Sequence, residues 1–436
     1  MKYTPQYDLS DKNVLIIDTS SAVELAILLA PRFKNTHYFC PWTKWGYPDA
    51  LAYYIGTGIK NVDRAYYVWE LVDAKKKDGT PYLDLVVFVD VYDWDIQKHI
   101  EQLGIPCYGC GWGAVLELDR IKFKKILKNA GLPVGKYDEV KGLDDLREYL
   151  KKHEDIWYKV SLLRGLFESE HSKNYKLIEP KLDDLQNELS ILKDEIDFCC
   201  ENTIDSENCV EIANDMWTVD GKYPNMCGGG FEVKNTIYLS VCKPHDDFPK
   251  QLTELNYKLS PVLNRLQYKG PFGTEVRVLD DGKGYCNDFT ARFSFPNTFL
   301  QMWHWLNYVD VAWGTAHGEV VDAIPRAKYG IEYIFKTEWA SNHYEPVYVD
   351  PSVREQVKLL NLMQQKDMLY VVPLLPGGSQ IGSCVACGDT IEEAVKNVKK
   401  VAEKVEGTGI SFEVDALDKE LPEKLKKLDN LGINFF

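Results

Sequence analysis

Acidic, hydroxyl and basic residues in the middle of the chain have the spacing of a metal or phosphate site. Glu275 lies in one expected strand, and Asp288 lies in the next. Thr290 and Arg292 follow Asp288 at intervals of two residues, so the three side chains share one face of an extended chain. Mg²⁺ prefers carboxylate oxygens and phosphates, and a guanidinium binds phosphoryl or carboxylate oxygens in a bidentate manner. The pattern predicts such a site, although an ion pair on a solvated strand face has the same spacing.

Two lysines can add positive charge to the same site. Lys124 lies in an expected helix, and Lys159 lies at the end of an expected strand. A lysine in an apolar strand is costly unless its ammonium group reaches water or an anion, and lysines bind phosphates as point charges. Taken singly, each lysine could instead lie at the surface with its ammonium group extended into solvent.

The elements that must position these residues begin with an α/β unit. Short apolar strands alternate with helical patterns, which is typical of a parallel sheet. The strands are expected at 14–18, 85–89 and 105–108, and the helices at 20–29 and around 96–103. The second helix is expected to have an inward apolar stripe of Ile96, Ile100 and Leu103. We therefore expect a Rossmann-like domain over residues 1–113.

A second unit is expected over residues 114–330. Asp119 can cap a helix that ends at Gly131, and Asp280-Asp281-Gly282 can form the turn of a hairpin. Strands are expected at 157–160, 197–202, 210–219, 273–279 and 284–289, and a helix with Leu185, Leu189 and Leu192 inward at 182–192.

A third, α+β unit is expected over residues 331–436. Strands are expected near 369–375 and 383–387. Thr390 and Glu393 form a capping box at the start of an amphipathic helix whose apolar stripe extends to Val405. The predicted fold class is thus a combination of α/β and α+β domains.

Composition narrows the functional class. At about 150 residues per domain, 436 residues predict about three domains. Fifty-one basic and 66 acidic side chains give a net charge of −15, which argues against non-specific nucleic-acid binding. No signal-peptide pattern or membrane-spanning run is visible, and eleven cysteines are an odd number for a disulfide framework. We expect a cytoplasmic protein with no membrane partner.

Cysteines and histidines offer a second possible metal site. Cys107 with Cys110, and Cys384 with Cys387, each resemble half of a zinc knuckle. The pairs are much further apart than the usual 15 to 20 residues, and residues three apart in a strand point to opposite faces. The two cysteine pairs could therefore bind one shared zinc ion, or the four cysteines could be buried apolar thiols. The isolated His304 and His317 fit core or surface positions.

The order of these segments resembles the ATP-grasp superfamily, in particular phosphoribosylamine–glycine ligase and its relatives. The resemblance runs through DLVVFVD, GIPCYG and LELDRIKFKKILKNAGLPV, then CENTIDSENCVEI and EVRVLDDGKGYCNDFTARFSFP, and ends at CGDTIEEAVKNVKKV. It implies a Rossmann-like N-terminal domain, a two-lobed ATP-grasp domain and a small C-terminal domain.

The resemblance also implies roles for single residues. Lys124 and Lys159 match contacts to the nucleotide and its phosphates, whereas Glu201 matches the adenine side and Glu211 the ribose side of the site. The metal positions correspond to Glu275, Asp288 and Thr290, and the arginine that holds the γ-phosphate and acyl phosphate corresponds to Arg292. The implied cofactors are ATP and Mg²⁺, with Mn²⁺ as an alternative metal.

Several segments depart from the family pattern. Asp288-Phe-Thr290 replaces the usual Glu-x-Asn, which predicts looser metal binding. The glycine-rich phosphate loop is replaced by residues 161–174, an expected lid in which Arg164 could contact phosphate or substrate. After three glycines, Glu232 and Lys234 are expected to share a strand face and could also bind substrate. A flexible turn followed by an ion pair fits the same residues.

The function implied by the resemblance is an ATP-dependent carboxylate–amine ligase. Such an enzyme forms an amide through an acyl phosphate and releases ADP and phosphate. The expected partners are a small-molecule carboxylate and amine that differ from the ligase's own substrates, and the expected state is a monomer or homodimer. A catalytically degenerate nucleotide-binding regulator is the alternative. A dinucleotide-dependent dehydrogenase is disfavoured because no Gly-x-Gly-x-x-Gly follows the first strand.

Overall fold

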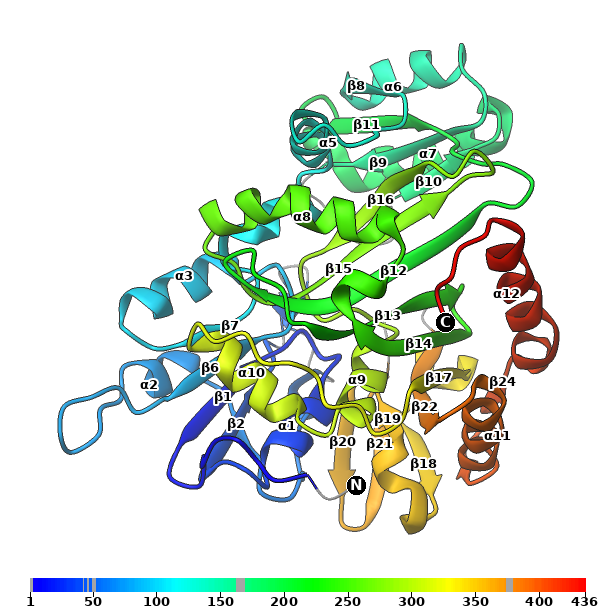
Figure 1. Ribbon diagram of the computed structural model, residues 1–436. Helices are drawn as coiled ribbons and strands as arrows, with labels where there is room; N and C mark the ends of the chain where they lie inside the picture. The colour runs from blue at the N-terminus through cyan, green and yellow to red at the C-terminus, as the bar shows by residue number, and fades with distance from the viewer. Residues whose placement is uncertain (1–2, 42, 45–46, 49–51, 162–168, 374–378) are drawn as a thin grey trace.

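The computed structural model describes residues 3–436 except 42, 45–46, 49–51, 162–168 and 374–378. Figure 1 shows the N-terminal segment in blue at the lower left, a small sheet at the top and a large sheet through the middle. The α/β and α+β fold class is confirmed. In the described part of the chain, no helix is long and apolar enough to cross a membrane.

The N-terminal segment forms a five-stranded parallel sheet in the order β5-β2-β1-β6-β7. Its strands are β1 (Asn13–Ile17), β2 (Asn35–Phe39), β5 (Asp63–Ala65), β6 (Leu85–Phe88) and β7 (Cys107–Tyr108), and its helices are α1 (Val23–Leu29), α2 (Val68–Val72) and α3 (Trp94–Gln102). All five residues of β1 are buried, as expected for a parallel strand covered on both faces. The short hairpin β3 (Thr43–Lys44) and β4 (Tyr47–Pro48) lies outside this sheet.

Two expectations for this segment are wrong in detail. Helix α1 begins at Val23 rather than at residue 20, because the Asp18 carboxylate accepts hydrogen bonds from the backbone N–H groups of Ser21 and Ala22 and holds this turn. Leu103 is 36% exposed rather than inward, because α3 ends at Gln102.

The small sheet has the order β10-β9-β11-β8 and is antiparallel. Its elements are β8 (Tyr137–Lys141), α6 (Leu143–Leu150), β9 (Ile156–Val160), β10 (Ser169–Ser172), α7 (Tyr175–Leu189) and β11 (Asp197–Asn202). The two helices and the sheet enclose a separate apolar core that includes Tyr158. Since side chains alternate along a strand, Lys159 projects from the face opposite to this core.

Helix α7 differs from the predicted helix over 182–192. It begins at Tyr175, because the side chain of Asn174 accepts a hydrogen bond from the backbone N–H of Leu177. It ends at Leu189, and Leu192 is 54% exposed rather than inward.

The large sheet has the order β16-β15-β12-β13-β14-β17-β22-β19, with β24 paired to β17. Its strands are β12 (Val210–Val219), β13 (Met226–Val233), β14 (Ile237–Pro244), β15 (Lys269–Val278), β16 (Gly284–Thr290), β17 (Tyr329–Lys336), β19 (Val357–Leu359), β22 (Gln380–Gly388) and β24 (Ser411–Phe412). Helices α4 (Val115–Leu118), α8 (Lys250–Arg265), α9 (Thr298–His304) and α10 (Tyr308–Ala316) contact its strands, and α5 (Arg120–Asn129) follows α4 toward the small sheet. The predicted hairpin is confirmed as β15–β16, with Gly282 at φ 76° in its turn.

The C-terminal segment continues the large sheet, because β14 pairs with β17 and β17 pairs with β22. The division at residue 330 therefore does not separate two sheets, and the three-domain division stays a prediction. The remaining elements are β18 (Glu345–Val349), β20 (Leu362–Gln365), β21 (Met368–Val371), α11 (Ile391–Ala402), β23 (Val405–Glu406) and α12 (Leu421–Asn430). The strand expected at 369–375 ends at Val371, and 374–375 lie outside the described residues.

Helix α11 confirms the predicted cap. The Thr390 side chain accepts a hydrogen bond from the backbone N–H of Glu393, while the Glu393 carboxylate accepts one from the N–H of Asp389. The expectation that the helix extends to Val405 is wrong, because α11 ends at Ala402 and Val405 begins β23.

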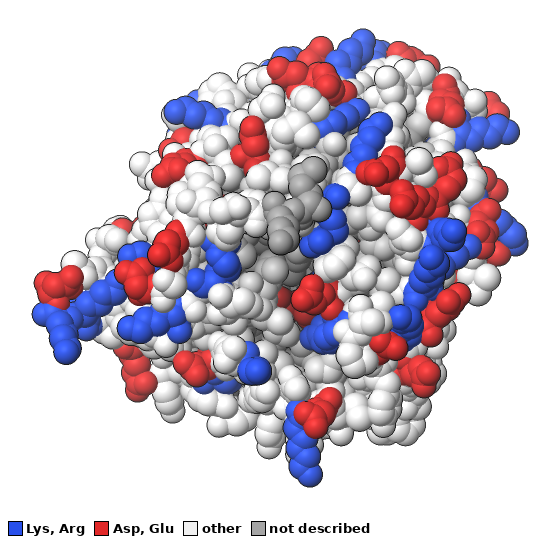
Figure 2. All heavy atoms as spheres, turned by 60° about the horizontal axis from the view of Figure 1, so that its bottom comes forward, with Lys and Arg blue, Asp and Glu red and all other residues white. Residues whose placement is uncertain are grey.

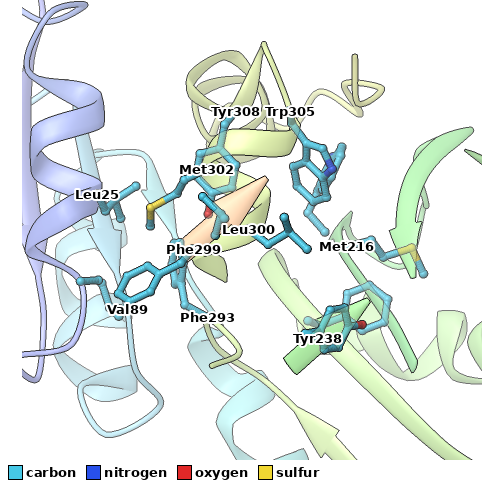
Figure 3. Close-up of a cluster of buried hydrophobic side chains, with 14 of the residues drawn as sticks. Leu25, Val89, Met216, Tyr238, Phe293, Phe299, Leu300, Met302, Trp305 and Tyr308 are labelled. Atoms are coloured by element: carbon cyan, nitrogen blue, oxygen red, sulfur yellow. The ribbon is translucent and has the colours of Figure 1, made fainter. Parts of the chain in front are cut away.

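The N-terminal sheet and the large sheet share one apolar core. Figure 3 shows Phe293 and Phe299 beside Val89, with Tyr238 and Met216 on the side of the large sheet. The backbone N–H of Phe293 donates to the carbonyl of Val89 at 3.2 Å. This bond fixes the segment that follows β16 against the end of β6 and so fixes the backbone beside Arg292.

A buried carboxyl group anchors the C-terminal segment. Glu332 on β17 is fully buried, and its carboxylate accepts hydrogen bonds from Ser383 Oγ at 2.7 Å and from the backbone N–H of Asn297 at 2.8 Å. Burial raises the pKa of Glu332 from 4.5 to about 7. The folded protein therefore favours the protonated carboxyl group of Glu332 up to about pH 7.

The raised pKa predicts a pH-dependent stability. The contribution of Glu332 is fully present below pH 4.5 and is lost as the pH rises to about 7, because ionisation is disfavoured in the folded state. The loss amounts to about 3 kcal/mol at most. We expect Tm to fall more steeply between pH 5 and pH 8 in the native protein than in Glu332→Gln, which cannot ionise. Parallel Tm curves for the two proteins would contradict this assignment.

Candidate functional site

Two of the predicted lysines meet acidic residues between the small and large sheets. Lys124 Nζ on α5 lies 2.9 Å from Glu201 Oε2 on β11. Lys159 Nζ on β9 lies 3.8 Å from Glu201 Oε1 and 3.4 Å from Asp288 Oδ1 on β16. Arg120 also forms an ion pair with Asp288. The structure therefore brings together Lys124, Lys159, Glu201 and Asp288 and adds Arg120.

The local sequence explains how the cations reach this point. Asp119 caps α5 by accepting a hydrogen bond from the backbone N–H of Lys122 at 2.9 Å. Arg120 and Lys124 are four residues apart and therefore lie on the same face of the helix. Both are nine-tenths buried, and Lys159 is equally buried on its strand. The cations are held in place before any ligand arrives.

The directions of the pKa shifts favour the ionised forms of Asp288, Lys159 and Glu201. Burial opposes ionisation of Asp288, but the positive charges of Lys159, Arg120 and Lys124 outweigh it and hold the pKa of Asp288 well below its ordinary value. Burial also acts to lower the pKa of Lys159, but Asp288 and Glu201 raise it overall. The pKa of Glu201 is lowered against burial by Lys159 and Lys124. Phosphate oxygens could exchange with these carboxylates as partners of the same cations.

Glu275 has a different environment from Asp288, although the two residues are direct cross-strand partners. Burial raises the pKa of Glu275 well above its ordinary value, and the charges of Glu211 and Asp288 raise it further. No lysine or arginine within 4 Å forms an ion pair with Glu275 in the described part of the chain. The carboxyl group therefore needs a proton or an added cation.

The donor set suits a hard divalent cation. The carboxyl groups of Glu275 and Asp288 and the hydroxyl of Thr290 supply oxygen from neighbouring strands, and oxygen is the donor that Mg²⁺ and Mn²⁺ prefer. Among the described residues, no group of three or more His, Cys, Asp or Glu side chains is placed to hold a metal ion. Mg²⁺ usually needs only one or two carboxylates beside phosphates and water. The metal role of these residues stays a prediction.

Arg292 is oriented by a buried carboxylate. Its Nε donates to Glu117 Oε1 at 2.9 Å, and the backbone N–H of Ala291 donates to Glu117 Oε2 at 2.7 Å. Glu117, on α4, is 3% exposed. Arg292 lines a cavity of about 80 Å³, together with Thr290 and Glu275. This geometry places a guanidinium beside the predicted metal ligands.

The remaining predicted residues lie apart from the ion pairs of Asp288, and only two of them line the cavity. Glu211 lines the same cavity and accepts hydrogen bonds from Arg277 at 3.1 Å and Asn287 at 2.8 Å. Glu232 also lines the cavity. The expectation that Lys234 shares a strand face with Glu232 is wrong, because β13 ends at Val233 and Lys234 is exposed in the next turn. Arg164 lies outside the described residues.

Three residues of this region were not predicted. Arg120 could have been found, because it precedes Lys124 by one helical turn. Glu117 contacts Arg292 across 175 residues of sequence, and no local pattern signals that contact. Asp215 lines the cavity two positions beyond Ala213, the residue that pairs with Glu275. Its alternation with Glu211 along β12 was the available signal.

The cysteines of both Cys-x-x-Cys pairs lie in protein interior positions. Cys107, Cys110 and Cys384 are buried, Cys387 is partly buried, and burial raises the pKa of all four thiols. Of the two alternatives for these cysteines, this environment favours buried thiols over a zinc site. Buried His304 donates from Nε2 to the carbonyl of Ala327 at 2.7 Å, and burial lowers its pKa to about 4.

The charge on the surface is mixed. On the face shown in Figure 2, blue Lys and Arg side chains are interspersed with red Asp and Glu side chains. The described residues of this face form no broad basic area of the kind that attracts nucleic acid.

Comparison with known proteins identifies the fold. No protein-family model and no curated protein sequence matches the chain. Its structure is similar to phosphoribosylamine–glycine ligase of Thermotoga maritima, with a TM-score of 0.67, 15% identity, and 92% of this chain and 98% of that one covered. It is also similar to the biotin carboxylase domain of 2-oxoglutarate carboxylase from Hydrogenobacter thermophilus, with a TM-score of 0.67 and 14% identity; the match covers 96% of this chain and 98% of that one. A third similar structure is N5-carboxyaminoimidazole ribonucleotide synthetase of Thermus thermophilus, with a TM-score of 0.55 and 12% identity; the match covers 90% of this chain and 98% of that one. All three are ATP-grasp enzymes, so the ATP-grasp resemblance is confirmed as a similarity of fold.

Proposed function

We propose that this chain, which has the ATP-grasp fold, is an ATP-dependent carboxylate–amine ligase that forms an amide through an acyl phosphate. One observation carries the proposal. The buried cations Arg120 and Lys159 pair with Asp288, and the buried Lys124 pairs with Glu201 beside them. Glu275, the strand partner of Asp288, lies in a cavity with Arg292. This arrangement offers neighbouring places for a polyphosphate, a hard cation and an acceptor group.

ATP would be held by the charged cluster. Lys124 and Lys159 would bind phosphate oxygens, while Glu201 and Glu211 would contact the adenosine part of the nucleotide. Mg²⁺ held by Glu275, Asp288 and Thr290 would neutralise phosphate charge. The ion pairs of Lys159 and Arg120 with Asp288 keep these side chains in position until phosphate and metal replace part of each pair.

Arg292 would act at the reacting groups. It would orient the substrate carboxylate, one oxygen of which attacks the γ-phosphorus while the bond to the ADP oxygen breaks. The guanidinium would stabilise the negative charge of the moving phosphoryl group. A neutral amine nitrogen would then form the C–N bond, and phosphate would leave with the electron pair of the C–O bond.

The names of the similar structures support this reaction class. One is called a phosphoribosylamine–glycine ligase, and another was solved with MgADP and bicarbonate. A different substrate is supported by the turn after β1. There the Asp18 carboxylate is occupied by hydrogen bonds from Tyr38 Oη at 2.6 Å and from the N–H of Ala22 at 2.7 Å.

A nucleotide-binding regulator is the second candidate. It is favoured by Thr290 at a metal position and by the absence of a three-membered acidic or histidine group among the described residues. A regulator would bind MgATP without turning it over in response to a carboxylate.

Nucleotide products separate the two candidates. We expect the protein to release ADP from MgATP only when a carboxylate and an amine are both present, and to form no AMP. The measurement is chromatography of nucleotides across pairs drawn from amino acids and small amines. MgATP binding without ADP release for any pair would favour the regulator.

A further inference from the structure

The carboxylate of Asp288, a predicted metal ligand, is already occupied by two cations of the protein itself. The guanidinium of Arg120 and the ammonium group of Lys159 contact the same oxygen, Oδ1, and the Lys159 contact is 3.4 Å long. The side chain of Asp288 is 34% exposed, so a metal ion in solution could reach it. Occupation by positive groups, rather than lack of access, therefore opposes metal binding at Asp288.

Arg120 is positioned by the packing of its helix. It is the first residue of α5 and follows the cap Asp119 directly, and its side chain is 10% exposed. On the same helix, the ring of Phe123 packs edge-on against Phe289 of β16, with the ring centroids 5.8 Å apart. Since Phe289 is the neighbour of Asp288 along the strand, this contact fixes the distance between α5 and the carboxylate. The pair of Arg120 with Asp288 therefore forms before any ligand arrives.

Two positive groups at one carboxylate oxygen oppose the binding of a third. A divalent ion on Asp288 would lie within about 5 Å of the guanidinium of Arg120 and of the ammonium group of Lys159. Like charges at this distance repel one another, most strongly where protein excludes part of the water. Glu275, the strand partner of Asp288, offers a second carboxylate, but Mg²⁺ usually takes phosphate oxygens as ligands as well. A metal ion alone is therefore expected to bind weakly.

A polyphosphate changes this balance. Phosphate oxygens are strong acceptors for guanidinium and ammonium groups, so they would compete with Asp288 for Arg120 and Lys159. Each contact that moves to phosphate leaves the carboxylate more open to a metal ion, and the phosphate adds further oxygen ligands. Lys124, which pairs with Glu201 at 2.9 Å, is a third cation that can contact the same phosphates.

We propose that Arg120 makes tight binding of the divalent cation depend on bound nucleotide, because its guanidinium holds Asp288 until phosphate oxygens replace the carboxylate. Coupling between two binding events is reciprocal, so Asp288 in turn weakens the binding of nucleotide that carries no metal. The inference rests on the proposed function, which places nucleotide and metal here. It goes beyond that function by assigning the coupling between the two ligands to one ion pair.

Binding of Mn²⁺ in the absence of nucleotide tests the role of Arg120. Free Mn²⁺ gives a six-line electron paramagnetic resonance spectrum that weakens when the ion binds protein, so a titration gives the Kd. We expect Arg120→Gln to bind Mn²⁺ more tightly than the native protein by about 10-fold or more, because a competing cation has been removed. The matched control is Arg265→Gln, which removes the same charge from the exposed end of α8 and should equal the native protein.

Binding of ATP in the presence of EDTA tests the reciprocal effect. Equilibrium dialysis with radiolabelled ATP gives the Kd of the metal-free nucleotide. We expect Asp288→Asn to bind metal-free ATP more tightly than the native protein by about fivefold or more, because Arg120 and Lys159 have lost the carboxylate that competes with phosphate. Partial unfolding would weaken binding, so it cannot produce either gain.

Unchanged or weaker Mn²⁺ binding by Arg120→Gln would overturn the inference, and so would unchanged or weaker binding of metal-free ATP by Asp288→Asn. The pair of Arg120 with Asp288 would then have only a structural role. Failure of the native protein to bind ATP even with Mn²⁺ present is a different result, because it would refute the proposed nucleotide site itself and the inference with it.

Discussion

Asp288→Asn is expected to lower the kcat for substrate-dependent ADP release on the order of 10³-fold, or about 4 kcal/mol in activation free energy. Asparagine has nearly the same shape but lacks the charge that pairs with Arg120 and Lys159 and that would bind the metal ion. The three buried cations would lose a counter-charge, and the metal would lose one of its two carboxylates. Steady-state ADP formation at saturating MgATP measures the effect.

Magnesium dependence distinguishes loss of metal binding from general damage. The Mg²⁺ concentration needed for half-maximal activity should rise at least 10-fold in Asp288→Asn, because one oxygen ligand becomes a weaker neutral donor. Arg265→Lys, an exposed change at the end of α8, should leave both kcat and the Mg²⁺ requirement within about twofold of the native values. A kcat above one tenth of the native value in Asp288→Asn would show that Asp288 has no metal role.

Arg292→Lys is expected to lower kcat by about 10² to 10³ while the Kd for MgATP changes less than about threefold. Lysine keeps the charge but cannot donate to Glu117 and to a second acceptor through a planar fork. The interaction would be lost mainly in the transition state, where the phosphoryl group carries its charge between two oxygens. Rapid-quench turnover and equilibrium MgATP binding measure the two quantities separately. A large increase in Kd with an unchanged kcat would instead make Arg292 a ground-state contact.

Local sequence patterns predicted the elements that hold the site. The cap at Asp119, the hairpin β15–β16 and the strand of Lys159 each depend on a few neighbouring residues, and each is present. The alternation of Asp288 with Thr290 on β16 is likewise a property of the strand itself. Such features are readable because residue type and spacing determine them.

Contacts between distant segments could not be predicted in this way. The pairing of Glu117 with Arg292 depends on the packing of α4 against β16, and that of Arg120 with Asp288 on the contact of α5 with β16 through Phe123 and Phe289. Asp215 enters the cavity because two strands of fixed register present Gly228 and Gly273 beside it. The start of α7 at Tyr175 depends on the cap from Asn174, which lies outside the apolar pattern, and Leu192 is exposed because it lies beyond the end of the helix at Leu189.

The proposed reaction depends on an acyl phosphate, and transfer of ¹⁸O from the carboxylate to phosphate tests for this intermediate. The protein is incubated with MgATP, an amine mixture and a panel of carboxylates labelled with ¹⁸O in both oxygens, and the released phosphate is examined by mass spectrometry. For the true substrate we predict one ¹⁸O atom per phosphate, with ADP in equal amount. Unlabelled phosphate or AMP as the product, or no phosphate from any member of the panel while MgATP binds, would contradict it.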